Sequence, residues 1–558
     1  MKKDLLILLL LILPAFAGLI QPGYFTMHDD LQGMRQLQMQ KCLNDLQIPC
    51  RWVSDLGYGF GYPLFNYYPP LPYYIGQIFH WSGLSYLDTV KAVGILGFIL
   101  TAWFMYLLGK KFWGRSGGLV SAAFYTYAPY HSLDFYVRGA MNEFWAMAFY
   151  PAIFFTSYKL IATAQKKWIP LLSLSVACLM LSHNPMLMIF APFLLIWIIY
   201  WWWKFRSVRS LFPLAVSAIW AAGLSAFFTL PVVFEQKYAH VQTLIIGYFN
   251  YLAHFLNLYQ IFIRNYWGYG ESINGPGDTM SFSLGYLHWI IPAVIIISLL
   301  FSKKIRSHAS LLILLTLTML FSLFMSHTRS IPVWQLIKPL EYLQFPWRFL
   351  TLAVFFTSFI SGAVILIFSK KILILLFLLL LLLNAGFFRP RLWYPDATDA
   401  TKFSGNSWRL LVTSGIFDYL PIWAPLPPPD AAGDDLNITG GEGSFRRISK
   451  KTNFQQYQID ITSPGAVVEL QTFYFPGWKI WVDGSPVPID PARDKLLGRM
   501  QVDMNTGVHI LTARFTNTPV RTIGNSLSLL SWLLLIYTIG APSLTRGPLA
   551  KLWPQKTL

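Results

Sequence analysis

The sequence has little charge for its length. Charged residues occupy 12% of its 558 positions, whereas soluble domains average roughly 25%. Hydrophobic residues reach 55%, and the mean hydropathy is +0.47. This shortage of charge excludes an ordinary soluble domain and indicates a protein embedded in a membrane.

Cysteine and the common catalytic signatures are also scarce. The chain has three cysteines and no CxxC pair, so it shows no sign of a metal site. Cys178 lies in an apolar run, whereas Cys42 and Cys50 share a polar loop and could form a disulfide in an oxidising compartment. The sequence also lacks a Walker A loop, HExxH and GxSxG, so nothing in it predicts ATP use, a zinc site or a serine nucleophile.

Basic and aromatic residues, in contrast, are abundant. The net charge is +18, and the Lys and Arg residues form short clusters between apolar runs. This arrangement is typical of membrane topology signals and argues against a nucleic-acid partner. Aromatic residues reach 17%, and their rings suit membrane interfaces and sugar-binding surfaces.

Apolar segments that could cross a bilayer recur along the chain. A spanning helix needs about 20 apolar residues. We predict twelve spans, at residues 4–20, 88–109, 117–133, 142–162, 168–183, 186–203, 211–231, 284–301, 308–326, 347–369, 372–388 and 524–542. Alternate loops carry the basic clusters, which predicts a multi-pass protein of the cytoplasmic (inner) membrane with both termini inside.

The first apolar segment has a second interpretation. Met1 to Ala17 combines a basic start, a short apolar core and an Ala15-Phe16-Ala17 ending, as a cleavable signal peptide does. We expect the segment to be retained as a helix. Either interpretation leaves the other loops on the same sides of the membrane.

The predicted topology divides the chain into three parts. Residues 1–388 form a transmembrane domain with a first outer loop at 21–87 and a second outer loop at 232–283. Residues 389–522 form a β-rich domain outside the cytoplasm, and residues 523–558 form the last span and a cytoplasmic tail. The domain is predicted to be a small β-sandwich because Pro-Gly and Asp-Gly turns separate period-2 strands at 455–462, 466–474, 478–482 and 508–517. Its residues do not decide between a spacer and a carbohydrate- or lipid-head-binding module.

An acidic pair, Asp29 and Asp30, follows the first span directly. A carboxylate at the membrane surface can take the proton from an acceptor hydroxyl, and a second one can orient the hydroxyl or hold a metal. The alternative is a pair of solvated acids in a loop.

Three further polar clusters fall at the same outer face. Arg138 and Arg348 suit bidentate contact with a phosphate, and His183 can carry a proton. The alternatives are structural ion pairs, a capped turn and interfacial anchoring. The candidate substrate-binding residues are His28, Asp134, Arg138, Glu143, His183, Asn184, Arg264 and Arg348.

Several motifs resemble known families. A long first outer loop that opens with His28-Asp29-Asp30 resembles the GT-C superfamily of membrane glycosyltransferases. YVRGAMNE, SHNP and LQFPWRFL resemble bacterial membrane proteins labelled "6-pyruvoyl-tetrahydropterin synthase-related", a label that implies no pterin chemistry. YFPGWKIWVDGSPVPI and GVHILTARF are similar to YfhO-like membrane proteins. The segments lie at 136–143, 182–185, 343–350, 474–489 and 507–515.

This resemblance implies a GT-C-like fold of about twelve spans, with the β-sandwich-like domain before the last span. It implies inverting transfer of a sugar from a polyprenyl-phosphate donor to a glycan, lipid or protein acceptor of the cell envelope. Asp29 or Asp30 is then the base, and Glu143 orients Arg138. Arg138, His183 and Arg348 are candidates for the donor phosphate. The first outer loop has no DxD triplet, so a need for Mg or Mn held by Asp29 and Asp30 stays open.

Two other classes of function remain. One is a transporter or flippase of a lipid-linked saccharide, although its usual inverted repeats and mid-membrane charges are not visible. The other is a non-catalytic protein of cell-surface assembly, with the β-rich domain as its working part.

Overall fold

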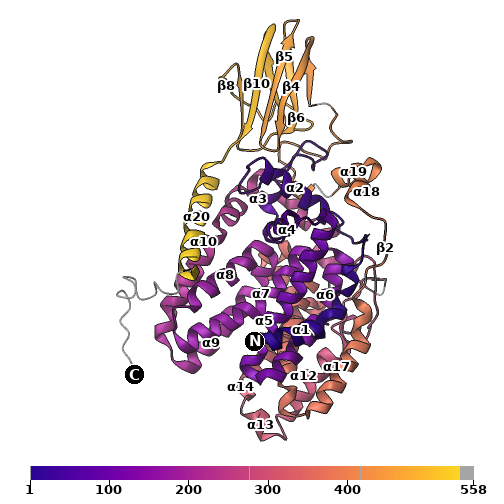
Figure 1. The fold of residues 1–558 in the computed structure, drawn as a ribbon, viewed down its shortest axis with the longest axis vertical. Helices are drawn as coiled ribbons and strands as arrows, with labels where there is room; N and C mark the ends of the chain where they lie inside the picture. The colour runs from indigo at the N-terminus through magenta and orange to yellow at the C-terminus, as the bar shows by residue number, and fades with distance from the viewer. Residues whose placement is uncertain (1, 276, 415–416, 434, 541–558) are drawn as a thin grey trace.

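A helical body carries a β domain at one end (Figure 1). The computed structural model describes residues 2–275, 277–414, 417–433 and 435–540. The main helices of the body are α1 (Lys2–Ile12), α5 (Tyr86–Thr126), α7 (Met141–Thr163), α8 (Trp168–Ser182), α9 (Asn184–Phe205), α10 (Leu211–Glu235), α12 (Tyr286–Ser298), α14 (Ala309–Ser326), α16 (Leu350–Ser361), α17 (Lys370–Asn384) and α20 (Pro519–Gly540). Short helices connect them, namely α6 (Pro129–Ser132), α11 (Leu258–Phe262), α13 (Lys303–Arg306) and α15 (Ile331–Leu336).

Many of these helices are long and apolar enough to cross a membrane. Within the described residues, seven segments qualify, at Tyr86–Thr126, Asn184–Phe205, Val208–Tyr238, Ala309–Ser326, Pro346–Leu366, Lys370–Phe387 and Pro519–Thr538. Each of the twelve predicted spans overlaps a helix. Residues 541–542 of the last span, and the predicted tail that follows, lie outside the described residues. The chain is a multi-pass membrane protein, while the number of crossings and their direction stay predictions.

Helix α5 holds two of the predicted spans because it folds back on itself at Gly114. This residue has φ 73° and ψ −177°, a conformation that essentially only glycine adopts. The two arms then touch, since a Cβ on Gly109 would lie 3.0 Å from the Cα of Gly118. Asp4 binds Lys110 and Arg115 at this turn, at 3.0 and 2.7 Å. The start of α1 and the basic turn of α5 therefore share one end of the body.

The first outer loop leaves the opposite end of α1 and builds a platform for the β domain. It contains α2 (Gln32–Asn44), α3 (Leu64–Tyr67) and α4 (Leu71–Trp81), and Cys42 and Cys50 form a disulfide within it. The ring centroids of Trp52 and Trp478 are 5.5 Å apart, so the platform and the β domain share one apolar core.

The β domain is a sandwich of two antiparallel sheets, as predicted. One sheet has the order β4-β5-β10-β7-β8 and the other β3-β6-β9. The strands are β3 (Leu436–Thr439), β4 (Gly443–Lys451), β5 (Phe454–Ile461), β6 (Ala466–Phe473), β7 (Trp478–Val482), β8 (Ser485–Val487), β9 (Arg499–Met504) and β10 (Gly507–Phe515). The sequence predicted β5, β6, β7 and β10 and missed β3, β4, β8 and β9. It missed β4 because this edge strand is largely exposed and its charges hide any alternation.

The segment before these strands belongs partly to the helical body. Strand β2 (Trp393–Tyr394) pairs with β1 (Tyr24–Phe25) of the first outer loop. Two short helices follow, α18 (Asp399–Lys402) and α19 (Gly405–Val412). The Asp399 carboxylate accepts hydrogen bonds from the backbone N–H groups of Tyr86 and Leu87, at 2.8 and 3.1 Å, which ties α18 to the first turn of α5.

A buried ion pair fastens the last helix to the rest of the fold. Glu235 at the end of α10 is 2% exposed. Its Oε2 accepts from Nε of Arg521 and from Nδ2 of Asn66, both at 2.9 Å, and its Oε1 accepts from the Thr518 hydroxyl at 2.5 Å. One carboxylate thus joins α10, α20 and the first outer loop.

We expect Glu235→Gln to destabilise the protein by about 3 kcal/mol or more, because it leaves Arg521 buried without a counter-ion. Thermal unfolding of the purified protein in detergent measures this. Glu341→Gln is the matched control, since Glu341 pairs with Lys338 at the surface and such pairs contribute at most about 1 kcal/mol. Equal unfolding temperatures for the two variants would show that the buried Glu235–Arg521 pair does not stabilise the fold.

Candidate active site

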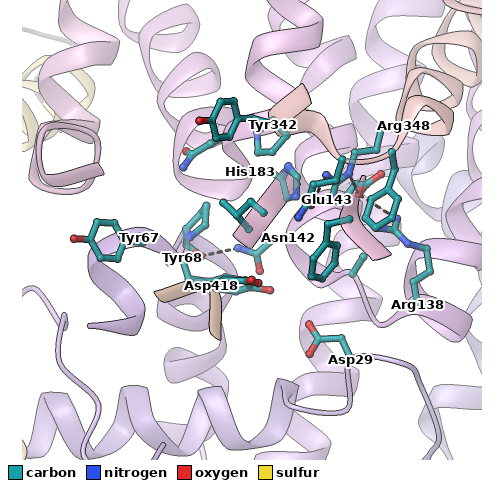
Figure 2. Close-up of a pocket in the computed structure, with 18 of the residues that line it drawn as sticks. Asp29, Tyr67, Tyr68, Arg138, Asn142, Glu143, His183, Tyr342, Arg348 and Asp418 are labelled. Carbon is teal, nitrogen blue, oxygen red and sulfur yellow. Dashed lines mark hydrogen bonds and ion pairs between the residues drawn. The ribbon is translucent and has the colours of Figure 1, made fainter. Parts of the chain in front are cut away.

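A cavity of about 1090 Å³ lies between the first outer loop, the helical body and the second outer loop. We call it the central cavity (Figure 2). The described residues that line it include seven of the ten predicted site residues, His28, Asp29, Arg138, Glu143, His183, Asn184 and Arg348. They do not include Asp30, Asp134 or Arg264. Segments that lie far apart in the sequence therefore meet in one volume.

Asp29 is held at the cavity wall by its backbone and by Arg35. The N–H groups of His28 and Asp29 donate to the carbonyls of Val137 and Arg138, both at 2.9 Å. This close approach requires Gly139, which has φ 66°, because a Cβ there would lie 2.6 Å from the sulfur of Met27. The first outer loop and the turn before α7 are thus joined at the site.

The Asp29 carboxylate keeps one free position. Arg35 binds it through both terminal nitrogens, at 2.6 Å to Oδ2 and 3.0 Å to Oδ1, and Gln32 donates to Oδ2 at 3.2 Å. A carboxylate has about four lone-pair positions, so one on Oδ1 remains. The side chain is 34% exposed, so this oxygen can accept a further hydrogen bond from a molecule in the cavity.

Asp30 does not line the cavity, so only Asp29 of the predicted acidic pair is in a position to contact a ligand there. Its Oδ2 binds Lys402 of α18, and burial raises the pKa of its carboxyl group. Asp30 thus anchors the segment that follows β2. Asp29 and Asp30 lie in a bend and a turn between β1 and α2, and their side chains bind different cations.

The two arginines share one buried carboxylate. Glu143, in the first turn of α7, is 1% exposed. Its Oε2 lies 3.0 Å from Nε of Arg348 and 3.1 Å from Nη1 of Arg138, and its Oε1 accepts from the Tyr130 hydroxyl at 2.7 Å. We call Arg138 and Arg348 the guanidinium pair. Figure 2 shows both beside Glu143.

The guanidinium pair retains free donors. Nη1 of Arg348 donates to the Leu343 carbonyl at 2.6 Å, and Nη1 of Arg138 binds Asp134. Neither Nη2 group has a hydrogen-bond partner within the described part of the chain. The Arg138 guanidinium also lies over the Trp347 ring, 4.4 Å from its centroid. Two oriented cations with open N–H groups are an arrangement that binds phosphate oxygens.

The three predicted site residues that do not line the cavity each contact another side chain. Asp134 is fully buried behind Arg138 in the π-helical turn Leu133–Arg138, so it supports the cation and does not meet a ligand. The Arg264 guanidinium lies over the ring of Tyr266, 4.5 Å from its centroid. Asp30 is anchored by Lys402 as described above.

His183 caps a helix and faces the cavity. Its Nδ1 accepts from the N–H of Met186 at 3.3 Å, in the first turn of α9. Its Nε2 has no hydrogen-bond partner among the described residues and can contact a ligand. The structure therefore confirms the capped turn, and the binding role stays a prediction.

Aromatic and apolar side chains form the remaining walls. Arg35 lies over the Tyr68 ring, 4.5 Å from its centroid. The other aromatic lining residues are Tyr62, Tyr67, Tyr248, Phe249, Tyr269, Tyr342, Phe345, Trp347 and Tyr419. The apolar lining residues include Met188, Val232, Val241 and Leu244. Aromatic rings suit a sugar face, and apolar side chains suit a hydrocarbon chain.

Sequence reasoning missed Arg35 and Asp418, which both line the cavity. The available signal for Arg35 was its helix, because α2 repeats Gln and Arg at helical spacing and buries Gln32, Arg35 and Gln36. A buried polar helix face indicates a polar cavity. Asp418 precedes a Pro-rich stretch that offers no periodic pattern, and burial raises the pKa of its carboxyl group.

The residues present do not fit a divalent metal. Asp29 is bound by Arg35 and Asp30 by Lys402, so the two carboxylates serve different cations. Within the described residues, no group of three or more His, Cys, Asp or Glu side chains could hold a metal ion. We therefore derive no step through a metal.

The second outer loop covers one side of the cavity with Tyr248, Tyr269 and Glu271. Between residues 249 and 266 the loop forms only short turns and α11. Asp278 holds the loop, since it accepts from Gln260 at 3.0 Å and from the N–H of Met280 at 2.8 Å.

Burial raises the pKa of Asp278 to about 7. A raised carboxyl pKa stabilises the fold below the unfolded value of 3.8, and this stabilisation is lost as pH rises through 7. We therefore compare the amide exchange rates of residues 258–275 and 277–282 with those of the same residues in Asp278→Asn at the same pH. We expect the ratio of the two rates to rise at least tenfold from pH 5 to pH 8. A ratio that does not change with pH would contradict this.

Comparison with known proteins gives structural neighbours only. No protein-family model matches the sequence, and no curated protein sequence matches it. The fold is similar to arabinofuranosyltransferase AftD from Mycobacteria, with 15% identity and a TM-score of 0.45 over 71% of this chain and 27% of AftD.

Two structures of the Archaeoglobus fulgidus oligosaccharyltransferase are also similar. One, tethered to an acceptor peptide, has 14% identity and a TM-score of 0.39 over 70% of this chain and 52% of the neighbour. The other, with an inhibitory peptide and a dolichol-phosphate, has 12% identity and a TM-score of 0.37 over 69% and 54%. The matches thus span about a quarter to a half of the neighbours' own length. Similarity of this size does not assign an activity to this chain.

Proposed function

We propose that the protein is a membrane glycosyltransferase that moves a sugar from a polyprenyl-phosphate-linked donor to an acceptor outside the cytoplasm. The observation that carries the proposal is the convergence of Asp29 and the guanidinium pair on one cavity with aromatic and apolar walls. A carboxylate with a free lone pair and two cations with free N–H groups are the parts that such a transfer needs. As part of this proposal, the chain is related to the GT-C superfamily and to the YfhO-like and "6-pyruvoyl-tetrahydropterin synthase-related" families that its motifs resemble.

The guanidinium pair binds the donor phosphate in this proposal. The acceptor hydroxyl oxygen attacks the anomeric carbon while the bond from that carbon to the phosphate oxygen breaks. The phosphate leaves with the bonding electrons, and Arg138 and Arg348 stabilise the charge that develops on it. Attack from the face opposite the phosphate inverts the anomeric centre.

Asp29 acts on the other side of the reacting carbon as the general base. Its free Oδ1 position accepts the proton of the acceptor hydroxyl. Arg35 orients the carboxylate through its two-point contact. Arg35 is therefore a positioning residue.

The surroundings of the cavity suit a lipid donor. Val232 and Leu244 belong to the lining, and the adjacent side chains of Val233 and Phe234 are 57% and 58% exposed at the end of a membrane-length helix. An apolar path from bilayer to cavity lets a polyprenyl chain stay in hydrocarbon while its phosphate reaches the guanidinium pair. The proposal places the site, the β domain and the acceptor (glycan, lipid or protein) at the outer face of the cytoplasmic membrane.

A reconstitution assay separates this function from its competitors. The purified protein in liposomes receives a panel of labelled polyprenyl-phosphate sugars and a cell-envelope extract as acceptor. Label in a new glycosidic linkage with inverted anomeric configuration supports the proposal. Label that crosses the bilayer on an intact donor indicates a flippase. Donor that is neither used nor moved indicates a non-catalytic assembly protein.

A further inference from the structure

A second pocket lies between the first outer loop and the β domain, apart from the central cavity. Its volume is about 540 Å³, within the range of roughly 300–1,000 Å³ that is typical of ligand sites. Helix α2 connects the two spaces, because Arg35 lines the cavity and Lys41 lines the second pocket. The elements around it, α2, α19 and β4, lie at the end of the helical body that carries the β domain (Figure 1). We call it the β-domain pocket.

Backbone hydrogen bonds fix the walls of the β-domain pocket. Tyr58 donates to the Val412 carbonyl at 3.0 Å and accepts from the N–H of Ala432 at 2.7 Å. On the other side, the N–H of Thr452 donates to Oδ2 of Asp45 at 2.6 Å. Three segments are thereby held together, so the pocket exists before any ligand arrives.

Cationic side chains gather around this pocket. Lys41 binds Asp55 at 2.5 Å, and Lys450 binds Asp435 at 2.7 Å. Arg447 also binds Asp435. Lys451 has no ion-pair partner within the described part of the chain. Four cations thus meet three carboxylates, Asp45 and Asp55 of the lining and Asp435 behind it, which leaves a surplus of one positive charge.

An aromatic ring and a buried amide complete the lining. Trp408 is partly exposed, and Nζ of Lys41 lies 5.7 Å from the centroid of its ring. Gln471 is 6% exposed, and its Nε2 has no hydrogen-bond partner among the described residues. Buried amide donors without a partner are rare in native proteins.

We propose that the β-domain pocket binds a saccharide that carries a carboxylate, such as a uronate-containing glycan. A pyranose ring can stack on Trp408, and its hydroxyls can bond to Asp45 and Asp55. The acidic group pairs with Lys451, whose charge is otherwise unmatched. Binding at this pocket needs no donor and no transfer, so the proposal stands apart from the chemistry of the central cavity.

Direct binding to the full-length protein in detergent tests this proposal. The probes are hexasaccharides of hyaluronan and of galacturonate, with neutral chitohexaose and inorganic phosphate for comparison, measured by calorimetry. We expect an acidic hexasaccharide to bind at least tenfold more tightly than chitohexaose, and excess phosphate to leave its affinity unchanged. Equal affinity for acidic and neutral sugars, no binding of either acidic probe, or displacement by phosphate would overturn the proposal.

Matched variants locate the binding. Lys451→Glu and Trp408→Ala should each lower the affinity for the acidic hexasaccharide at least tenfold. Lys479→Glu makes the same charge change at an exposed position of β7 and should leave the affinity unchanged. Lys451 is exposed, so its variant keeps the test valid if Trp408→Ala does not fold. Equal effects of Lys451→Glu and Lys479→Glu would contradict the site. Asp29→Asn should not alter this binding, whatever its effect on transfer.

Discussion

Asp29→Asn should lower the rate of sugar transfer by about 10²–10⁴-fold, the range expected for loss of a general base. Asparagine keeps the size of the side chain but cannot accept the proton of the acceptor hydroxyl. The rate of glycosidic bond formation at saturating donor measures the loss. Donor affinity should change little, because the guanidinium pair and not Asp29 contacts the phosphate in this account.

Asp30→Asn is the internal control for this prediction. The two residues are neighbours in sequence, but Asp30 binds Lys402 and does not line the cavity. We expect its variant to transfer sugar at a rate close to that of the unmodified protein. Equal losses of transfer rate in both variants, or full activity of a correctly folded Asp29→Asn protein, would contradict the assignment of Asp29 as the general base.

Glu143→Gln should have the second large effect, on both stability and donor binding. Glutamine keeps the shape of Glu143 but removes the charge shared by Arg138 and Arg348, so two buried cations lose a counter-ion. Removing one partner of a buried ion pair costs about 3–5 kcal/mol. The released arginines should also shift, and the KM for donor should rise at least tenfold.

The measurements are the unfolding temperature and donor kinetics of the same preparation. Asp503→Asn is the control for stability, since Asp503 pairs with Arg493 at an exposed site, where its side chain is 73% exposed. A Glu143→Gln protein with unchanged unfolding temperature and unchanged KM would show that Glu143 does not organise the guanidinium pair.

The architecture could be predicted because the bilayer restricts what the chain can do. Membrane spans must be apolar and largely uncharged, so the charged segments between them are easy to recognise in the sequence. The hairpin of α5 was visible as two apolar segments, at 88–109 and 117–133, around a basic turn. The sandwich was visible where its strands alternate, and invisible in β4, which is an exposed, charged edge.

The site could be predicted only in part, for reasons of geometry. The sequence predicts that Arg138, His183 and Arg348 lie at one membrane face, and in the fold all three line one cavity. Sequence cannot tell which of Asp29 and Asp30 faces that cavity, because the direction of each side chain depends on backbone pairing with residues 137–138.

The two missed residues show the same limit. Arg35 binds Asp29 from the first turn of α2, a polar helix. Asp418 lines the cavity from a segment near the β domain that has no periodic pattern. The positions of Arg35 and Asp418 at the cavity depend on tertiary packing, which cannot be predicted from a local sequence pattern.

An electron cryo-microscopy structure of the protein with a bound polyprenyl phosphate tests the central claim most directly. The account predicts phosphate oxygens within roughly 2.7–3.2 Å of nitrogen atoms of Arg138 and Arg348, with Oδ1 of Asp29 facing the same space. A phosphate bound elsewhere, for example at Arg264, with the guanidinium pair unoccupied, would contradict it.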